Sequence, residues 1–545
     1  MGWSFLGKFA MWVVIILAQV NGHIGGCLER ERRGLLEFKD FLKSNGADAD
    51  HLLPTWVEKP DHHSECCDWE RVTCDCTTGH VTELFLHNVK DVLYEDFRIW
   101  VINASLFLPF KDLQSLTLSS NSFSGWTDNE GFEKLSTLRK LETLSLEWNE
   151  FDDSILPSFS ALRSLKMLNL RANKIEGLFP PHELAYFGNL ERLDLSYNQF
   201  NDIQAIERAL STDERQKQVE SPLFVGKSKV EEGRQPLGNI STLVELSMEG
   251  IRKGPVTRSI TRQVQNKASQ SGCESLSRLE KLETLYLTQY ESNRENKFNK
   301  SIILCLSSLI SLKNLSLQGN NLGDPFPARE LMVLKNLETL DLSFNEFSSL
   351  TIEDSKLLSN LSKMRHLNPS NNNFDKDAFR ILGALPSLKF LSLESNRIEG
   401  PLSNQGLTSF RHLEILDLSR NNFFASIPPS IGALSSLKAL SLAQNNLNGS
   451  LSIQGKNSIR LCKLKKLEEL DLSYNLFEGI LPPCLRNMRS LKFFDISLNQ
   501  FTETFLHLCL EAFTPSSTLV LVIIVSRVYS HSAHLQTIQT LRWLN

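Results

Sequence analysis

The pattern Leu-x-x-Leu-x-Leu-x-x-Asn recurs along this chain about every 24 residues. Clean copies begin at Leu113, Leu141, Leu165, Leu190, Leu312, Leu337, Leu388, Leu413, Leu437, Leu467 and Leu491. Weaker copies begin at Val81, Leu243, Leu282 and Met364. A fixed period of this length is typical of a solenoid, in which each repeat adds one strand to a shared sheet and stacks on its neighbours. We therefore expect one elongated coil with a long concave surface and no natural active-site cleft.

The spacing of residues within each repeat predicts which side chains are buried. Alternate side chains of a strand face opposite ways, so the second and third leucines of each copy point together into a shared core. The final Asn is present in twelve of the fifteen copies, from Asn121 to Asn499, and turns inward as well. A buried amide left without partners costs about 1–3 kcal/mol, and the backbone of the neighbouring coil can supply them. These features predict an α/β solenoid: a right-handed leucine-rich-repeat superhelix with a concave parallel β-sheet.

The N-terminus has the layout of a secretory signal peptide. Lys8 precedes an apolar stretch over residues 9–18, and Gly22 offers a small residue for cleavage. The stretch is too short to cross a bilayer, and the alternative is a buried first helix. We assign residues 1–22 to the signal peptide and expect the secretory pathway, leading to the plasma-membrane exterior or the extracellular space.

Glycosylation sequons and cysteines agree with secretion. The sequons are those of Asn103, Asn239, Asn299, Asn314, Asn360 and Asn448. Cys462 and Cys484 lie 22 residues apart, close to one repeat, so adjacent coils would bring them within disulfide reach. Pairing of Cys273 with Cys305 is a weaker hypothesis, and the state of Cys509 stays open.

A block without the repeat, residues 23–80, precedes the first clean copies. Leu35, Phe38 and Leu42 have helical spacing, which predicts an amphipathic helix from Glu29 to Lys43. The first coil of a solenoid would otherwise expose its apolar end to water. We expect this block to be a cysteine-stapled cap that covers that end.

The cap resembles the N-terminal cap of plant extracellular leucine-rich-repeat proteins. The motifs that carry the resemblance are Cys27-Leu-Glu-Arg-Glu, Leu35-Leu-Glu-Phe-Lys, Trp56, Cys66-Cys-Asp-Trp and Val72-Thr-Cys. The resemblance implies two disulfides, which map here as Cys27 to Cys66 and Cys67 to Cys74.

One departure from the family pattern leaves that pairing open. Cys76 is an additional thiol two residues after Cys74. A zinc site formed by Cys74, Cys76, His62 and His63 is the rival interpretation, although the spacing fits no zinc template well.

The residues after the repeat Asn extend the resemblance. Residues 176–180, 426–428 and 479–482 carry Gly-x-x-Pro or a relative of it, which resembles the plant form of the repeat with a second short strand. The similarity covers roughly residues 27–500, and the chain is identified as a member of the plant receptor-like protein group. Such proteins normally continue through more repeats and one membrane span. No span is visible here, and we interpret the chain as a C-terminally truncated member.

Interruptions of the repeat divide the chain after the cap into four segments. We predict a first solenoid block over residues 81–200, an irregular charged insertion with a degenerate repeat over 201–272, a second block over 273–501 and a non-repeat tail over 502–545. The insertion is either an island that helps to bind a ligand or a disordered segment, and its low apolar content favours the second. The tail holds an apolar run at 519–525, whereas a spanning helix needs about 20 residues.

Motifs that carry catalysis are missing from the sequence: it has no Gly-x-Gly-x-x-Gly, His-Arg-Asp, Asp-Phe-Gly, Gly-x-Ser-x-Gly or His-Glu-x-x-His. Recurrent aspartates hold one repeat position, so we read them as a ladder on the sheet rather than as glycosidase carboxylates. They are Asp194, Asp341, Asp417, Asp471 and Asp495. A net charge of −5 gives no basic footprint for nucleic acid. We expect a protein that is not an enzyme, with no cofactor, no metal and no nucleic-acid partner.

Large side chains on the concave face are the candidate contacts. The positions that flank the inward leucines are mostly small or polar, and Trp, Tyr and Arg are the residues most enriched at binding hot spots. We predict a partner-binding surface formed by Glu147, Trp148, Arg171, Arg192, Tyr197 and Tyr286. The alternative is that exposed aromatic residues are scattered by drift.

Three functions compete. The first is a receptor-like ectodomain that binds a peptide, glycan or protein and acts through a co-receptor, which the resemblance implies to be a receptor kinase in defence or developmental signalling. The second is a secreted inhibitor of pathogen cell-wall-degrading enzymes, of the polygalacturonase-inhibitor type. Such inhibitors are shorter, with about ten repeats and a closing cysteine cap. The third is a hydrolase, which the missing catalytic motifs disfavour.

Overall fold

The chain is represented by a computed structural model. It describes residues 27–58, 65–90, 100–127, 134–159, 162–201, 273–289, 298, 300–402, 404–451, 460–482, 484–485, 488–501 and 521–523. The predicted signal peptide, almost all of the predicted insertion, the weak repeat at Leu243 and Cys509 lie outside these residues.

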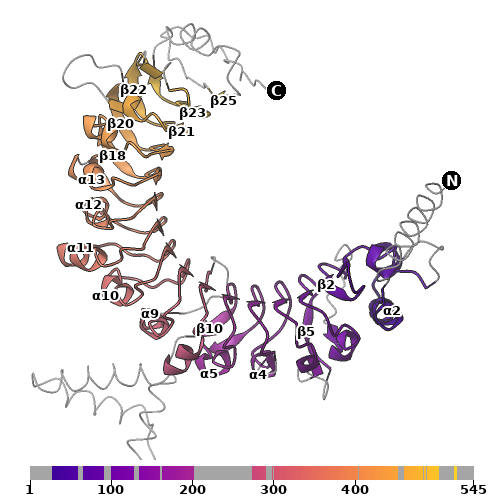
Figure 1. Ribbon diagram of the computed structural model, residues 1–545. Helices are drawn as coiled ribbons and strands as arrows, with labels where there is room; N and C mark the ends of the chain where they lie inside the picture. The colour runs from indigo at the N-terminus through magenta and orange to yellow at the C-terminus, as the bar shows by residue number, and fades with distance from the viewer. Residues whose placement is uncertain are drawn as a thin grey trace, which may run out of the picture.

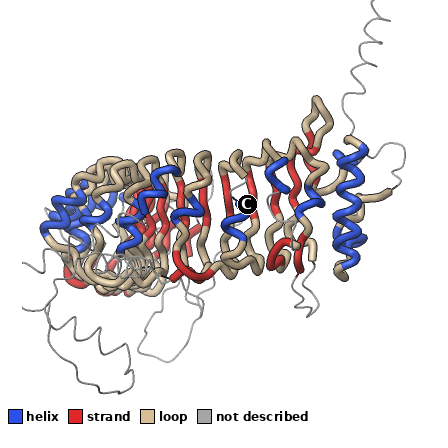
Figure 2. The backbone as a smooth tube through the Cα atoms, turned by 90° about the horizontal axis from the view of Figure 1, so that it is seen from below, coloured by secondary structure: helices blue, strands red, loops and turns tan. Residues whose placement is uncertain are grey.

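The fold is the predicted leucine-rich-repeat solenoid. The described coils follow an arc whose inner side is lined by strands and whose outer side carries the short helices (Figure 1). The strands lie side by side along the coil (Figure 2). All strands of the inner sheet pair in parallel except β1, which is antiparallel to β2. The predicted concave parallel sheet is therefore confirmed.

The inner sheet has sixteen strands among the described residues. In sheet order they are β1 Val72–Cys74, β2 Val81–Phe85, β4 Ser115–Thr117, β6 Thr143–Ser145, β7 Met167–Asn169, β9 Arg192–Asp194, β11 Thr284–Tyr286, β12 Asn314–Ser316, β13 Thr339–Asp341, β14 His366–Asn368, β15 Phe390–Ser392, β17 Ile415–Asp417, β19 Ala439–Ser441, β21 Glu469–Asp471, β23 Phe493–Asp495 and β25 Leu521–Ile523.

Short helices return the chain on the outer side, because a coil of about 24 residues leaves room for little more than one or two turns. The α-helices here are α4 Ile155–Ser158, α5 Pro181–Leu184, α9 Ser301–Leu306, α10 Ala328–Leu331, α11 Ile352–Leu358, α12 Ala378–Leu382 and α13 Asn404–Ser409. The 3₁₀ turns are η3 Ala104–Phe107, η4 Lys134–Thr137, η6 Glu274–Arg278, η7 Pro429–Ala433 and η8 Arg460–Lys463.

A second set of strands follows the repeat Asn, as the plant-type extension predicts. One sheet joins β16 Glu399–Pro401, β18 Asn422–Ala425, β20 Asn446–Ser450, β22 Leu476–Gly479 and β24 Gln500–Phe501. Two smaller sheets pair β8 Glu176–Leu178 with β10 Gln199–Asn201, and β3 Trp100–Ile102 with β5 Phe123–Trp126.

The core is one continuous row of aliphatic layers. In neighbouring coils Leu144, Leu168 and Leu193 stand opposite one another in the sheet and are buried. Full burial of a leucine side chain contributes about 1.5–3 kcal/mol. Because each layer packs on the next, the coils are stable only as a stack.

The Asn residues form the predicted ladder. Asn149 is buried, and its Nδ2 donates to the carbonyls of Leu118 at 2.9 Å and Leu146 at 3.0 Å. Its Oδ1 accepts from the backbone N–H groups of Asn121 at 3.1 Å and Phe123 at 3.0 Å. Each amide thus joins two coils, and its role is architectural.

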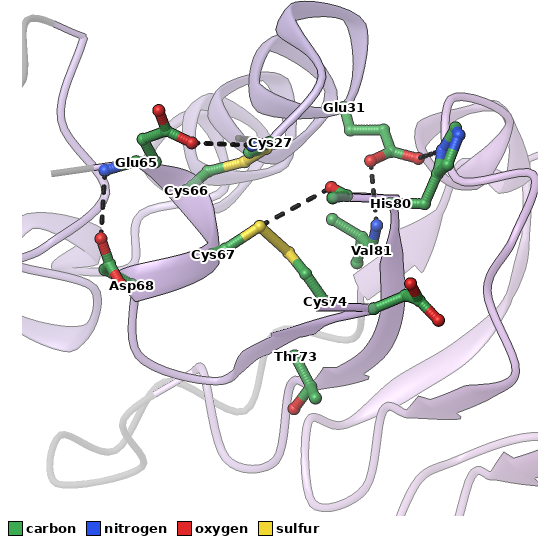
Figure 3. The surroundings of a disulfide bond; sticks show 12 residues. Cys27, Glu31, Glu65, Cys66, Cys67, Asp68, Thr73, Cys74, His80 and Val81 are labelled. Atoms are coloured by element: carbon green, nitrogen blue, oxygen red, sulfur yellow. Dashed lines mark hydrogen bonds and ion pairs between the residues drawn. A yellow bond between two sulfur atoms is a disulfide. The ribbon is translucent and has the colours of Figure 1, made fainter. Parts of the chain in front are cut away.

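The cap covers the first coil with helix α2, which runs from Glu29 to Ser44, one residue beyond the predicted end at Lys43. The short elements α3 Ala49–Leu52 and η2 Cys66–Asp68 complete the cap. Figure 3 shows two disulfides there, Cys27–Cys66 and Cys67–Cys74.

A buried carboxylate fastens the cap to the solenoid. Glu31 on α2 is buried, and it accepts from the backbone N–H of Val81 at 2.9 Å and lies 3.1 Å from Nδ1 of His80 (Figure 3). Val81 begins β2, so this one side chain connects helix α2 to the second strand of the sheet.

The strand pairing of the inner sheet bears on two predicted segments, the insertion over residues 201–272 and the tail over residues 502–545. Strand β9 pairs directly with β11, so the first and second predicted solenoid blocks share one sheet. Within the segment predicted as a non-repeat tail, Leu521–Ile523 form β25 and pair with β23. These three residues of the predicted tail therefore extend the inner sheet, and two of them, Val522 and Ile523, are of the β-branched type that favours strands.

Candidate partner-binding site

The predicted contact residues lie on neighbouring strands of the first block. Glu147 and Trp148 follow β6, Arg171 follows β7, and Tyr197 follows β9. These three strands are adjacent in the sheet. The repeat therefore places the side chains of the three coils at the same edge of the concave surface.

A backbone feature sets the direction of two of these side chains. In all twelve coils that carry the ladder Asn, the residue before it has a positive φ; for Trp148 and Tyr197 the values are 54° and 57°. The left-handed conformation costs a non-glycine residue about 1–2 kcal/mol. Because the whole row shares it, this geometry belongs to the turn that points each Asn inward, and it presents the preceding side chain at the edge of the sheet.

The structure brings Trp148 and Tyr197 together at a hollow of about 460 Å³. The hollow is lined by Ser120, Ser122, Trp148, Asn149, Glu150, Ala172, Asn173, Lys174, Tyr197 and Gln289. Trp148 is 58 % exposed, a large apolar surface open to solvent. The hollow therefore combines an indole with hydroxyl, amide and charged groups, a mixture that suits a polypeptide.

Arg171 is held in place beside this hollow. Its guanidinium lies 4.2 Å from the centre of the Tyr197 ring, a cation–π contact. Glu147 accepts a hydrogen bond from Nδ2 of Asn169 at 2.9 Å. Three of the six predicted contact residues thus form one group, the Trp148 cluster: Trp148, Arg171 and Tyr197. Glu147 precedes Trp148 in the chain and lies beside this group.

A partly buried carboxyl lies within the electrostatic reach of this cluster. Burial raises the pKa of Asp194, while the Ser196 backbone N–H and hydroxyl and the charge of Arg171 act against that rise. Oδ1 of Asp194 accepts from the Ser196 N–H at 2.9 Å. This carboxyl supports the strand end, as its repeat position predicts.

The other two predicted contacts lie apart from the hollow. Arg192 is exposed on β9, and Tyr286 on β11 stands opposite Asp194 in the sheet. Neither belongs to the lining of the hollow. Both face the concave side, so they border the Trp148 cluster rather than complete it.

The remaining predicted positions are placed as follows. Disulfides join Cys462 to Cys484 and Cys273 to Cys305, and Cys76 is a free, exposed thiol. Because Cys74 pairs with Cys67, it cannot serve the rival zinc site, whose His62 and His63 lie outside the described residues. Among the described residues no group of three potential ligands could hold a metal ion.

The sequons differ in their surroundings. Asn360 and Asn448 are exposed. Asn103 caps η3 by accepting from the Ser105 N–H, and Asn314 on β12 donates to Oγ1 of Thr284 at 3.0 Å. Asn239 and Asn299 lie outside the described residues.

Sequence reasoning missed a second group of large concave side chains. His366, Phe390 and Ile415 occupy the third position of three successive repeats and stand opposite one another in the sheet. None of the three is a Trp, Tyr or Arg, the residue types from which the contact surface was predicted. Alignment of the repeats by their third position would have found them.

Known proteins resemble this chain in its cap and in its repeats. The family model for the "Leucine rich repeat N-terminal domain" matches residues 28–75. Models for the "Leucine rich repeat" match residues 139–200, 336–361, 412–434 and 466–488. These models therefore match the cap and parts of both predicted repeat blocks.

Its sequence relatives are plant receptor-like proteins, which confirms the resemblance drawn from the cap. "Receptor-like protein 9a" of Arabidopsis thaliana is 41 % identical over 195 residues, or 35 % of this chain and 19 % of the relative. "Receptor-like protein 1" of the same plant is 40 % identical over 202 residues, or 35 % and 18 %. The chain thus spans about a fifth of the length of the relatives it matches.

Two solved structures align with much of the chain at low identity. A leucine-rich-repeat protein of Leptospira interrogans aligns with 80 % of this chain and 95 % of its own, at 20 % identity and a TM-score of 0.45. A plant peptide hormone receptor aligns with 80 % and 57 %, at 22 % identity and a TM-score of 0.42. In the part of the chain that the structure describes, no helix has the length and apolarity to span a membrane.

Proposed function

We propose that this chain is a non-catalytic recognition protein outside the cell, which binds a protein or peptide partner on the concave face of its solenoid. The observation that carries the proposal is the exposed indole of Trp148 beside the Arg171–Tyr197 pair, at a hollow of the inner sheet. The cation–π contact orders two side chains before a partner arrives, which lowers the entropy cost of binding.

The sequence relatives support a role in perceiving a signal. They are receptor-like proteins of a plant. We infer that the partner is an extracellular cue in defence or development, and that a receptor kinase acts as the co-receptor that passes the signal on. The concave face would then hold the cue while the ends or flanks of the solenoid remain free.

The Trp148 cluster can be tested with a variant that separates binding from folding. Trp148→Gly removes the indole and places at this left-handed position the one residue that adopts it freely, so the fold is expected to hold. The secreted full chain would be immobilised and exposed to apoplastic fluid, and bound polypeptides would be quantified by mass spectrometry. We expect at least one species held by the wild-type chain to fall about tenfold or more with Trp148→Gly.

Tyr474→Gly is the matched control. Tyr474 occupies the same repeat position with a φ of 54° and is 54 % exposed, but it lies after β21 in the second block. Its replacement should leave the captured species unchanged. If Trp148→Gly and Tyr474→Gly behave alike, the Trp148 cluster is not the contact surface.

A further inference from the structure

A stripe of aromatic and aliphatic side chains crosses the concave sheet in the second block. His366, Phe390, Ile415 and Ala439 lie on β14, β15, β17 and β19 and are register partners from strand to strand. Ile415 is 38 % exposed, and the rings of His366 and Phe390 are 6.2 Å apart. We call these four residues the apolar stripe. Strand β15 is seven places beyond β6 in the sheet, so the stripe is separate from the Trp148 cluster.

The dimensions of the stripe fit an extended segment of polypeptide. Three intervals between four neighbouring strands span about 14 Å, since strands lie about 4.8 Å apart. An extended chain advances about 3.3 Å per residue, so four to five residues, roughly, would cover the stripe. Thr339 precedes the stripe and Glu469 follows it in the same row, and these polar residues bound it at both ends.

A charged row runs alongside the stripe, because each stripe residue directly follows a charged one. In chain order the row is Arg365, Lys389, Glu414 and Lys438. Glu414 is shared between two lysines, at 2.7 Å from Nζ of Lys389 and 2.7 Å from Nζ of Lys438. Arg365 lies 4.0 Å from Glu338 of the preceding coil. The three cations of the row therefore face two carboxylates, which leaves a net positive charge of one.

The row also borders a hollow of about 610 Å³ that can receive a polar group. It is lined by Glu338, Ser362, Lys363, Arg365, Ser387, Lys389, His412, Glu414 and Ser436. Three cationic side chains and three hydroxyls face two carboxylates here. The lining favours a carboxylate over a cation.

We propose that the apolar stripe and its charged row form a second docking surface, which takes an extended acidic peptide. Apolar side chains of the peptide pack on Phe390 and Ile415, and a carboxylate of the peptide reaches the hollow beside Arg365 and Lys389. This surface is independent of the Trp148 cluster. Contact with the lysines is electrostatic at a solvent-exposed edge, so rising salt concentration weakens the complex.

The test is selection of peptides against the secreted full chain. A library of random nine-residue peptides would be displayed on phage, and enriched sequences would be made synthetically for affinity measurement. We expect enrichment of apolar residues at alternating positions together with Asp or Glu. The double variant Phe390→Ser/Ile415→Ser should weaken the binding of these peptides at least about tenfold, and Lys389→Gln/Lys438→Gln should abolish the preference for acidic residues.

A control variant and the properties of the selected peptides show whether the apolar stripe is the docking surface. Ile352→Ser replaces an isoleucine that is 66 % exposed on α11, on the outer side, and should leave the affinity unchanged. Peptides that bind the stripe double variant as tightly as the wild type, or that lack acidic residues, overturn the inference. Peptides whose binding depends on Trp148 alone also overturn it while supporting the proposed function. Recovery of no peptide overturns the second surface, and the capture experiment with apoplastic fluid still tests the first.

Discussion

At the residue scale, the same repeat position can be filled by different side chains for different physical reasons. The residue before the ladder Asn is left-handed in every coil that carries that Asn, yet only Gly319 fills it with glycine. The reason is contact: a Cβ at Gly319 would lie 2.1 Å from the carbonyl oxygen of Gln289 in the preceding coil. At Trp148 the turn is open, and a bulky residue is tolerated.

This explanation predicts a difference between two glycines. Gly319→Ala is expected to destabilise the chain more than Gly323→Ala. Both have a positive φ, at 72° and 62°, but a Cβ at Gly323 has no neighbour within 4 Å. The backbone strain costs each variant about 1–2 kcal/mol, and the clash adds to it only at Gly319. Thermal unfolding followed by circular dichroism measures both. Equal shifts would show that the contact with Gln289 relaxes without cost.

At the element scale, successive strands are joined by charge as well as by backbone hydrogen bonds. The residue after the first leucine of a repeat pairs with its counterpart in the next coil, as Lys166 does with Glu142 and Lys492 with Glu468. Exposed pairs contribute little one by one. A row of them still favours one register between coils, because a slip would separate the paired charges.

Glu414 makes this row sensitive to acid. Hydrogen bonds from Lys389 and then Lys438 lower the pKa of Glu414 to about 2 from 4.5. A carboxyl whose pKa is lower in the folded state contributes stability above pH 4.5, and that contribution is lost as the pH falls from 4.5 toward 2. We therefore expect Glu414→Gln to lower the Tm at pH 6.

The difference between Glu414→Gln and the wild type should shrink steadily below pH 4.5. Glu399→Gln, at an exposed position of β16, is the control for loss of a surface carboxylate, and its Tm at pH 6 should stay close to that of the wild type. Thermal melts at half-unit steps from pH 6 to pH 2.5 give the comparison. A Tm difference for Glu414→Gln that stays constant over this range would contradict the assignment.

At the scale of the whole molecule, stability passes from coil to neighbouring coil, as expected for a solenoid. Asn345 illustrates the links: its Nδ2 donates to the carbonyls of Leu317 and Leu342, and its Oδ1 accepts from the N–H groups of Asn320 and Leu322. All of these groups belong to two adjacent coils. Damage at one amide should therefore remain local.

Asn345→Leu tests this locality. The variant leaves buried backbone groups without partners, at about 1–3 kcal/mol for each, so amide hydrogen exchange in residues 312–322 and 337–347 should speed up at least about tenfold. Exchange in residues 141–151 should be unchanged. Asn404→Leu, at an exposed position of α13, should alter neither segment. Uniformly faster exchange along the chain would mean that the solenoid unfolds as one unit.

The sequence alone determined the solenoid, the inward leucines, the Asn ladder and the extent of helix α2, because each follows from a short periodic pattern whose burial is repeated in every coil. Only the tertiary structure decided which concave side chains become neighbours. Asp194 and Tyr286 are 92 residues apart yet opposite one another, since β9 pairs with β11 across the interrupted stretch. The residues of the apolar stripe share one repeat position, but only the pairing of β14, β15, β17 and β19 brings them side by side. The repeat pattern specifies which residues each coil buries, whereas the stacking of the coils determines which exposed side chains lie side by side.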